Sequence, residues 1–228
     1  MAKHDKIIVG NSTILNPVPV VMVSCAGKDP SKAEERPNIV TIAWTGTVNS
    51  EPPMVYISVR KSRHSYNMIK ETGEFVINLV NKSLAKSCDY CGVRSGKDED
   101  KFKTCGLTAV KAEGLEYAYA IKEAPVSISC KVKSVTELGS HDMFVAEVVA
   151  VTADSYLKDE EGKLCLDKAK LISYNHGEYF SLGDKLGFFG YSVASDEVFE
   201  KRMGYKRERD KYKHLREEGS QKKNGKKY

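Results

Sequence analysis

Long hydrophobic runs are missing from this sequence. No window of its 228 residues approaches the roughly 18 uninterrupted apolar residues of a membrane-spanning helix. The first ten residues, MAKHDKIIVG, also lack the apolar core of a secretory signal peptide. We therefore expect a cytoplasmic protein without a membrane partner.

Cysteine is sparse, with six residues at positions 25, 88, 91, 105, 130 and 165. This number is too small and too scattered for a disulfide framework in a chain of this length, so we expect reduced thiols. Only Cys88 and Cys91, in CDYC, form a close pair. Zinc needs four ligands and no second pair of this spacing occurs, so we predict no metal site. A redox role for the pair is a minor alternative.

Nucleotide-binding fingerprints are also missing. The sequence has neither G-x-G-x-x-G nor a P-loop, which argues against a Rossmann or Walker site. Short runs rich in Val, Ile, Thr and Tyr indicate strands at residues 19–25, 39–45, 54–59, 75–79, 126–135 and 144–152. Helical patterns are confined to residues 65–72, 83–90 and the C-terminal tail. We predict a mainly β protein with a closed or nearly closed antiparallel barrel.

The positive charge lies in the tail. Residues 196–228 carry twelve Lys and Arg against seven Asp and Glu, which accounts for the whole net charge of +5. We predict a β domain over residues 1–195 and a basic helical tail over residues 196–228. The tail begins after Ser195 as N-cap and is disordered at its end. A role in nucleic-acid binding is the less expected alternative, because basic termini are generally solvated.

Residues 57–79, ISVRKSRHSYNMIKETGEFVINL, read as a strand, a polar cluster, a short helix and a second strand. The cluster concentrates cations and hydroxyl groups where the helix begins, and helix N-termini attract anions. Its members are Ser58, Arg60, Lys61, Ser62, Arg63 and Ser65. The pattern fits a phosphate seat and, equally, a solvated turn with Ser65 as the N-cap.

Two other segments allow contact with a planar or charged ligand. Trp44, the only tryptophan, ends a strand among hydroxyl groups, where it suits either a flat ring or the core. Lys101 follows the charged segment CGVRSGKDED, which we expect to be an exposed loop. This lysine suits contact with an anion or, as for most loop lysines, solvation.

Two more segments bring histidine and tyrosine to turns. His141 lies in the turn GSHD just before a strand, where it suits a hydrogen bond to a ligand or a simple turn role. Tyr174, His176 and Tyr179 surround a glycine, and these rings suit stacking on a ligand or a dimer contact.

Taken in order, these segments resemble the flavin reductase-like family of FMN-binding split barrels, and most closely its flavoredoxin-like branch. The resemblance runs from about Asn16 to Ser195 and includes NPVPVVMVS, PNIVTIAWTG, GSHDMFVAEVVAV and ISYNHGEYFSLG. It implies a six-stranded antiparallel Greek-key barrel with short helices and a C-terminal helix. It also implies a homodimer with one FMN per subunit near the interface.

The resemblance implies a set of FMN-binding residues. Position by position these are Asn38, Trp44, Thr45, Thr47, Ser58, Val59, Arg60, Lys61, Ser65, Asn78, Lys101, His141 and Tyr174. Residues 58–65 match the loop for the ribityl chain and phosphate. His141 matches the histidine of the family's Gly-Asp-His turn and is the implied catalytic residue, in contact with flavin and nicotinamide. The turn departs from that pattern, because Ser140 replaces the acid and Asp142 follows the histidine.

The implied function is an oxidoreductase that passes electrons from NADH or NADPH through FMN to free flavin, oxygen or a redox partner protein. An electron carrier that keeps its FMN and has no efficient NAD(P)H site is the alternative. A non-catalytic FMN or nucleic-acid binding module that uses the basic tail is a third class.

Overall fold

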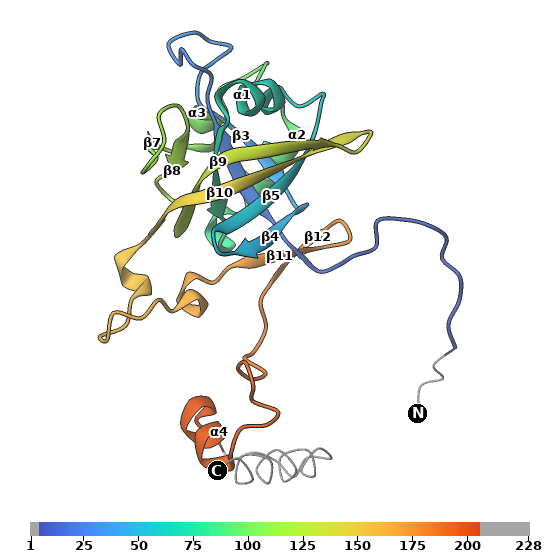
Figure 1. Ribbon diagram of the computed structural model, residues 1–228, viewed down its shortest axis with the longest axis vertical. Coiled ribbons are helices and arrows are strands. Elements are labelled where there is room, and N and C mark those ends of the chain that lie inside the picture. The colour runs from blue at the N-terminus through green and yellow to red at the C-terminus, as the bar shows by residue number, and fades with distance from the viewer. Residues whose placement is uncertain (1–4, 206–228) are drawn as a thin grey trace, which may run out of the picture. The chain divides into compact units, whose positions relative to one another are not determined.

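Figure 1 shows a computed structural model of the chain, which describes residues 5–205. The chain divides into two compact units, Met1–Leu182 and Gly183–Tyr228. This division falls after Leu182, whereas the sequence analysis placed the boundary after Ser195.

A seven-stranded antiparallel sheet forms the body of the first unit (Figure 1). Its strand order is β3-β2-β6-β9-β10-β5-β4. The strands are β2 (Val21–Cys25), β3 (Asn38–Ile42), β4 (Thr45–Ser50), β5 (Pro53–Arg60), β6 (Glu74–Leu79), β9 (Val126–Glu137) and β10 (His141–Ala153). Six of them correspond to the six strands that the sequence predicts.

The seventh strand results from a bend in one of the six. Only Ala43 and Trp44 separate β3 from β4, although these two strands form opposite edges of the sheet. The Ser58 N–H donates to the Trp44 carbonyl at 2.9 Å beside this bend. The bent β3–β4 strand therefore rolls the sheet into a six-stranded barrel. Because β10 returns to lie beside β5 after β6 and β9, the barrel has Greek-key topology, and the predicted fold class is confirmed.

The barrel interior is filled by alternate residues of the strands. Val23, Ile57, Phe75 and Phe144 are fully buried there. Burying a side chain of this size contributes about 1.5–3 kcal/mol, so this cluster supplies much of the stability. A second buried cluster lies on the other side of β2 and β3, under helices α2 (Ala85–Val93) and α3 (Lys101–Cys105).

The remaining elements of this unit are short. They are helix α1 (His64–Thr72), the hairpins β7 (Ala109–Lys111) with β8 (Tyr119–Ile121) and β11 (Ile172–Asn175) with β12 (Glu178–Ser181), strand β1 (Val18–Pro19), and the 3₁₀ turns Lys82–Leu84, Ser155–Leu157 and Leu166–Ala169. β1 pairs with β11.

Two local predictions were wrong. Helix α1 begins one residue earlier than expected, so its N-cap is Arg63 and Ser65 lies inside the helix. The segment around Lys101 is not simply an exposed loop, because Asp100 caps helix α3 by accepting a hydrogen bond from the Lys103 N–H. The many charged residues of the segment led us to expect a loop and not the short capped helix α3.

The second unit contains helix α4 (Asp196–Met203). Ser195 caps it, as predicted, by accepting a hydrogen bond from the Val198 N–H at 3.3 Å. The buried Phe199 packs its ring against Phe188 and Tyr205. The predicted disordered basic end of the tail lies outside the described residues.

No helix within residues 5–205 has the length and apolar character required to cross a bilayer.

Glu74 joins the β7–β8 hairpin to the barrel. Its buried carboxylate accepts hydrogen bonds from the backbone N–H groups of Glu116, Tyr117 and Ala118, the shortest at 2.7 Å. Charged acceptors form the stronger hydrogen bonds of proteins, and a buried group that loses its partner is costly.

We expect Glu74→Gln to lower the free energy of unfolding by about 2 kcal/mol, because an amide replaces one acceptor oxygen by a donor that faces backbone N–H groups. Urea denaturation measures this change. Glu71→Gln, at an exposed position on α1, is the control and should leave stability nearly unchanged. Equal stability of the two variants would contradict an anchoring role for Glu74.

Candidate functional site

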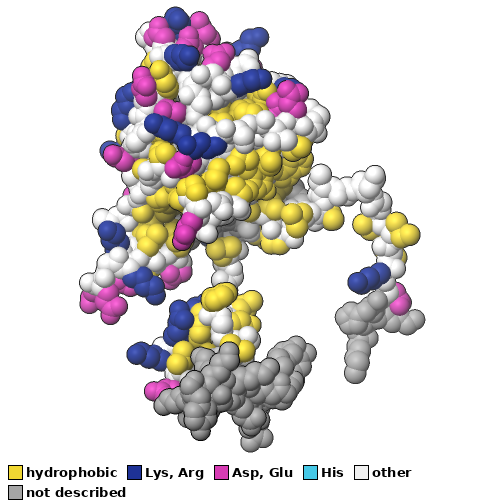
Figure 2. Space-filling view, in the orientation of Figure 1, with side chains coloured by type: hydrophobic (Ala, Val, Ile, Leu, Met, Phe, Trp, Pro, Cys, Tyr) yellow, Lys and Arg dark blue, Asp and Glu magenta, His cyan; other side chains and the backbone are white. Residues whose placement is uncertain are grey.

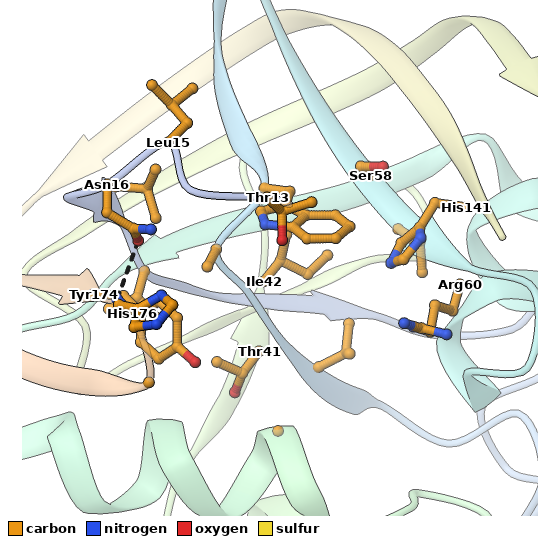
Figure 3. Close-up of a pocket in the computed structure, with 18 of the residues that line it drawn as sticks. Thr13, Leu15, Asn16, Thr41, Ile42, Ser58, Arg60, His141, Tyr174 and His176 are labelled. Carbon is orange, nitrogen blue, oxygen red and sulfur yellow. Dashed lines mark hydrogen bonds between the residues drawn. The ribbon is translucent and has the colours of Figure 1, made fainter. Parts of the chain in front are cut away.

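Two adjoining cavities lie at one end of the barrel. The main cavity has a volume of about 700 Å³ and the cationic cavity about 280 Å³. Val40, Arg60, Arg63 and Val93 line both, so the two form one continuous site. β3, the end of β5, the C-terminal turn of α2 and the β11–β12 hairpin supply the walls of the main cavity (Figure 3).

Positive side chains dominate the cationic cavity. Arg60, Arg63, Arg94 and Lys101 line it, together with the hydroxyl groups of Ser62, Ser65 and Ser95. None of its lining residues is Asp or Glu. Such an arrangement of donors without a counter-charge suits an anion with several acceptor oxygens, such as phosphate.

The N-terminus of α1 adds to this positive charge. Its first turn, with Arg63, His64 and Ser65, lines the cationic cavity, and no side chain caps it. No acidic residue lies in the first turn either. The uncapped backbone N–H groups and the positive end of the helix dipole therefore face the same cavity as the arginines.

Asn38, Ser65 and Gly96 form a closely packed wall of the cationic cavity. Asn38 donates from Nδ2 to Ser65 Oγ at 2.8 Å, which links β3 to α1 and leaves the Ser65 hydroxyl hydrogen available. Gly96 packs so closely on Asn38 that a Cβ there would collide with Asn38 Oδ1. Glycine at this position therefore lets the loop after α2 close the wall.

Lys101 is buried, not solvated. Its Nζ donates to the Ile39 carbonyl at 2.7 Å and to the Cys91 carbonyl at 2.9 Å, which fastens β3 to the end of α2. Burial lowers the pKa of this ammonium group. Two of its three donors are used, and it lines the cationic cavity, so the third remains for an anion there.

His64 carries an unsatisfied buried atom. Its Nε2 is shielded from solvent and has no hydrogen-bond partner in the described part of the chain. Burial, helped by Arg36 and Lys101, lowers the pKa of this imidazole. A neutral ring with an unpaired nitrogen beside a cationic cavity fits a polar ligand that completes the site.

Trp44 and His141 form the aromatic part of the main cavity. Their ring centroids lie 4.6 Å apart at an angle of 47°. Trp44 remains 42% exposed, unlike a core tryptophan, so its face is available to a ligand. Burial lowers the pKa of His141, with Arg60 and Arg63 contributing, and Ser140 Oγ lies 2.9 Å from its Nδ1. The Ser140 hydroxyl group therefore holds the Nδ1 atom of the His141 ring and leaves the Nε2 atom available to a ligand.

The structure brings most of the predicted binding residues together. Trp44, Ser58, Val59, Arg60, His141 and Tyr174 line the main cavity, and Asn38, Arg60, Ser65 and Lys101 line the cationic cavity. Thr45, Thr47, Lys61 and Asn78 line neither cavity.

Each of these four residues has another environment. The Lys61 ammonium pairs with Glu137 at 3.1 Å and with Asp142 at 3.4 Å, away from the cavities. Asn78 is fully buried between strands, where its amide bonds the Met22 carbonyl and the Ile121 N–H. Thr45 donates to the Tyr56 carbonyl and Thr47 is exposed on β4.

Asp142 also lies away from the cavities. Its fully buried carboxylate accepts a hydrogen bond of 2.5 Å from the Tyr66 hydroxyl. This bond, together with Lys61, lowers the pKa of Asp142. Strand alternation explains the placement, because neighbouring residues of β10 point to opposite faces and His141 takes the cavity side.

Several lining residues were not among the predicted binding residues. Arg94 and Ser95 follow α2, and Asn16 and Thr13 precede β1. Only tertiary structure brings these segments to the site, and nothing in their local pattern indicates it. Arg63 and Ser62 lie in the predicted cluster, and the helix start at His64 would have identified them.

The thiols of the CDYC pair are inaccessible to solvent. Cys88 and Cys91 are fully buried, and burial raises the pKa of the Cys88 thiol to about 12. The Cys91 sulfur instead lies 3.9 Å from that of Cys105.

The residues that line the two cavities have the chemical properties needed to bind flavin mononucleotide. A phosphate suits the cationic cavity, and a flat conjugated ring suits the adjoining cavity with Trp44 and Tyr174. Arg60 and Arg63 line both cavities, so they lie where the two parts of such a ligand join.

Comparison with known proteins agrees with this geometry. The chain is 30% identical to flavoredoxin of Desulfovibrio vulgaris (Miyazaki F), covering 81% of this chain and 97% of that one, with a TM-score of 0.73. It is 27% identical to flavoredoxin from Methanosarcina acetivorans, covering 83% and 100%, also with a TM-score of 0.73. An uncharacterized protein of Archaeoglobus fulgidus is 32% identical over 147 residues, which cover 64% of this chain and 81% of that protein.

Residues 14–183 match the Flavin reductase like domain, so most of the first unit has the sequence pattern of this family. With its split barrel and its paired cavities, the chain belongs to the flavin reductase-like family.

Proposed function

We propose that this protein binds FMN and passes electrons from NADH or NADPH through it to an acceptor. One observation carries the proposal. The uncapped N-terminus of α1 and the side chains of Arg60 and Arg63 surround a cavity that opens into a second one with an exposed tryptophan face. This combination suits a ligand with a dianion at one end and a flat ring at the other.

FMN fits better than FAD. The cationic cavity is small, at about 280 Å³, and the sequence lacks the glycine-rich fingerprint that holds a pyrophosphate on a Rossmann helix. The similarity to two flavoredoxins supports a flavin ligand.

The residues of the chain bind and orient in this proposal. When bound, FMN supplies two-electron chemistry, accepting a hydride from a nicotinamide. Arg60, Arg63 and the α1 N-terminus hold the phosphate, and Trp44 covers part of the ring. His141, whose pKa burial lowers, offers its second ring nitrogen, Nε2, for a hydrogen bond beside the flavin ring.

The second candidate is an electron carrier of the flavoredoxin type. Its support is the 30% identity to a flavoredoxin and the turn at Ser140 and Asp142, which departs from Gly-Asp-His. In this case FMN binds in the same place, and NADH and NADPH reduce it poorly. The third class, a binding module that uses the basic tail, depends on residues outside the described range.

We also propose that the protein is a homodimer. Four outward-facing residues of β5 and β10 are apolar and only half-buried, namely Met54, Tyr56, Met143 and Val145. Figure 2 shows hydrophobic side chains gathered on this face of the barrel. An exposed apolar patch of this kind generally marks an interface, and a twofold dimer is the commonest solution.

Arg60→Ala and Arg63→Ala should each weaken FMN binding about 10- to 100-fold, because each removes a charge-assisted hydrogen bond of about 1.5–3 kcal/mol. Titration of the FMN-free protein, followed by quenching of flavin fluorescence, measures the affinity. Lys61→Ala is the matched control and should keep wild-type affinity, since this lysine pairs with Glu137 and Asp142. A colourless protein that takes up no FMN would sink the proposal.

Mixing the FMN-loaded protein with NADH or NADPH in the absence of oxygen should bleach the flavin. His141→Asn should slow this reduction about tenfold through loss of one ligand contact, while FMN affinity stays within a few-fold of wild type. Because burial lowers the pKa of His141 from its usual value of about 6.5, any loss of rate from protonation of this residue should appear at a lower pH than for an unperturbed imidazole. If neither donor bleaches the wild-type flavin, the electron-carrier function is correct instead.

Light scattering at micromolar concentration should give the mass of a dimer. Met143→Glu, on the outward face of β10, should shift the protein toward the monomer, because a charge is costly at an apolar contact. Glu147→Gln, on the same strand, is the control and should remain dimeric. A wild-type monomer with full FMN content would refute the interface and leave flavin binding intact.

A further inference from the structure

Two cysteine thiols meet beside the cationic cavity. Cys91 lies in the last turn of α2, and Cys105 is the last residue of α3. Their sulfur atoms lie 3.9 Å apart, and neither is bonded to another cysteine. The segment between them, residues 92–104, carries Arg94 and Lys101, which line the cationic cavity. The two thiols therefore lie at the two ends of the segment that forms one side of this cavity.

Glu99 holds the two thiols in this position. Its Oε2 atom accepts a hydrogen bond from the Tyr90 hydroxyl at 2.8 Å and another from the Thr104 hydroxyl at 2.9 Å. Tyr90 directly precedes Cys91, and Thr104 directly precedes Cys105. One carboxylate thus joins α2 to α3 next to both sulfur atoms. Because hydrogen bonds to a charged acceptor are the stronger ones in proteins, the two thiols are held close together.

The two thiols differ in accessibility. Cys105 is half-buried, whereas Cys91 is fully buried. Burial, together with the neighbouring Cys105, raises the pKa of the Cys91 thiol. A buried thiol with a raised pKa is inert toward a reagent in solution, so an oxidant has to react first at Cys105. An accessible cysteine beside a second one that can attack it is the arrangement in which oxidation ends in a disulfide.

The end of α2 is hydrogen-bonded to two cations of the candidate site. The Cys91 carbonyl accepts from Lys101 Nζ at 2.9 Å, and the Gly92 carbonyl accepts from Arg63 Nη1 at 3.0 Å. A disulfide bond is about 2.05 Å long, so the two sulfur atoms must approach each other by nearly half of their present separation. Lys101 and Cys105 lie one helical turn apart on α3. A movement that joins the sulfurs therefore also displaces Lys101 and Arg63 relative to the carbonyls that hold them.

We propose that peroxide converts Cys91 and Cys105 into a reversible disulfide, and that this bond weakens anion binding in the cationic cavity. The Cys105 thiol attacks one oxygen of hydrogen peroxide, the O–O bond breaks, and a sulfenic acid and one water form. The Cys91 sulfur then displaces the hydroxyl group of the sulfenic acid, which leaves as a second water with the proton of the Cys91 thiol. The two sulfurs lose two electrons in total, and these reduce one peroxide to two waters.

Mass spectrometry tests the bond. The full-length protein is treated with hydrogen peroxide, freed of peroxide with catalase, unfolded and alkylated with iodoacetamide. The number of alkylated cysteines should fall from six to four, and peptide mapping should link Cys91 to Cys105. Dithiothreitol should restore all six, because sulfinic and sulfonic acids are not reduced by it. Six alkylated cysteines after treatment, an irreversible loss, or a link between Cys88 and Cys91 would each overturn the proposal.

Three variants identify the reacting residues. Cys105→Ser removes the half-buried sulfur, and Cys91→Ala removes the buried one and keeps its surroundings apolar. Neither variant should give a linked peptide. Cys165→Ser replaces the other half-buried cysteine, so it is the matched control and should form the bond as the wild type does. Loss of the link in the control would contradict the assignment.

Titration with FMN measures the effect on the cationic cavity. The oxidised wild type should bind FMN at least fivefold more weakly than the reduced protein, and dithiothreitol should restore the affinity. Cys105→Ser should bind FMN equally before and after peroxide, which excludes oxidation at other residues as the cause. Unchanged affinity in wild-type protein that carries the bond would overturn the link between the disulfide and anion binding.

The effect on FMN rests on the proposed function, whereas formation of the disulfide does not. If the protein takes up no FMN in either state, the proposed function fails, and the mass measurement still tests the cysteine pair. Inorganic phosphate then replaces FMN as the probe, with the shift in melting temperature as the readout. Phosphate should raise the melting temperature of the oxidised protein less than that of the reduced protein, and equal shifts would overturn the effect on anion binding.

Discussion

The bend between β3 and β4 brings the aromatic wall of the site beside the cations that follow β5. The Ser58 N–H bonded to the Trp44 carbonyl holds this bend against β5 and closes the barrel. It exposes the Trp44 ring on one side and keeps the end of β5, with Arg60, on the other. Arg63 and α1 follow directly from that strand end. A sheet that stayed open there would separate the aromatic wall from the cations, so barrel closure and ligand binding share one constraint.

The cationic cavity gathers positive charges that lack a negative partner among its lining residues. Three arginines, a buried lysine and a helix N-terminus face it without an acidic partner among its lining residues. Burial is the main cause of the lowered pKa of Lys101 and His64, and neighbouring cations, Arg63 for Lys101 and Arg36 for His64, lower them further. Stability for this region comes from elsewhere, notably from the apolar barrel core and from carboxylates such as Glu74 that are fully hydrogen-bonded.

Local patterns predicted the fold well and the site in part. Six strands and the cap at Ser195 follow from periodicity and residue preference, because both act over a few neighbouring residues. The polar cluster of residues 58–65 was recognised because its residues are contiguous, and Arg60, Ser62, Arg63 and Ser65 of it line the cationic cavity. Lys61 lines neither cavity because it pairs with Glu137, which is remote in sequence. Asn16, Arg94 and His176 come from three separate segments, so their meeting depends on the tertiary fold alone.

Because the first turn of α1 has no side-chain cap, binding of the proposed ligand there would add to the stability of the fold. A ligand that binds only the folded state adds RT ln(1 + [L]/Kd) to the free energy of unfolding, about 2.7 kcal/mol at a hundredfold excess over Kd. Without the proposed ligand, the protein would populate locally open forms more often, and proteases act on such forms. The steady-state amount of this protein would then follow the supply of flavin without any dedicated regulator.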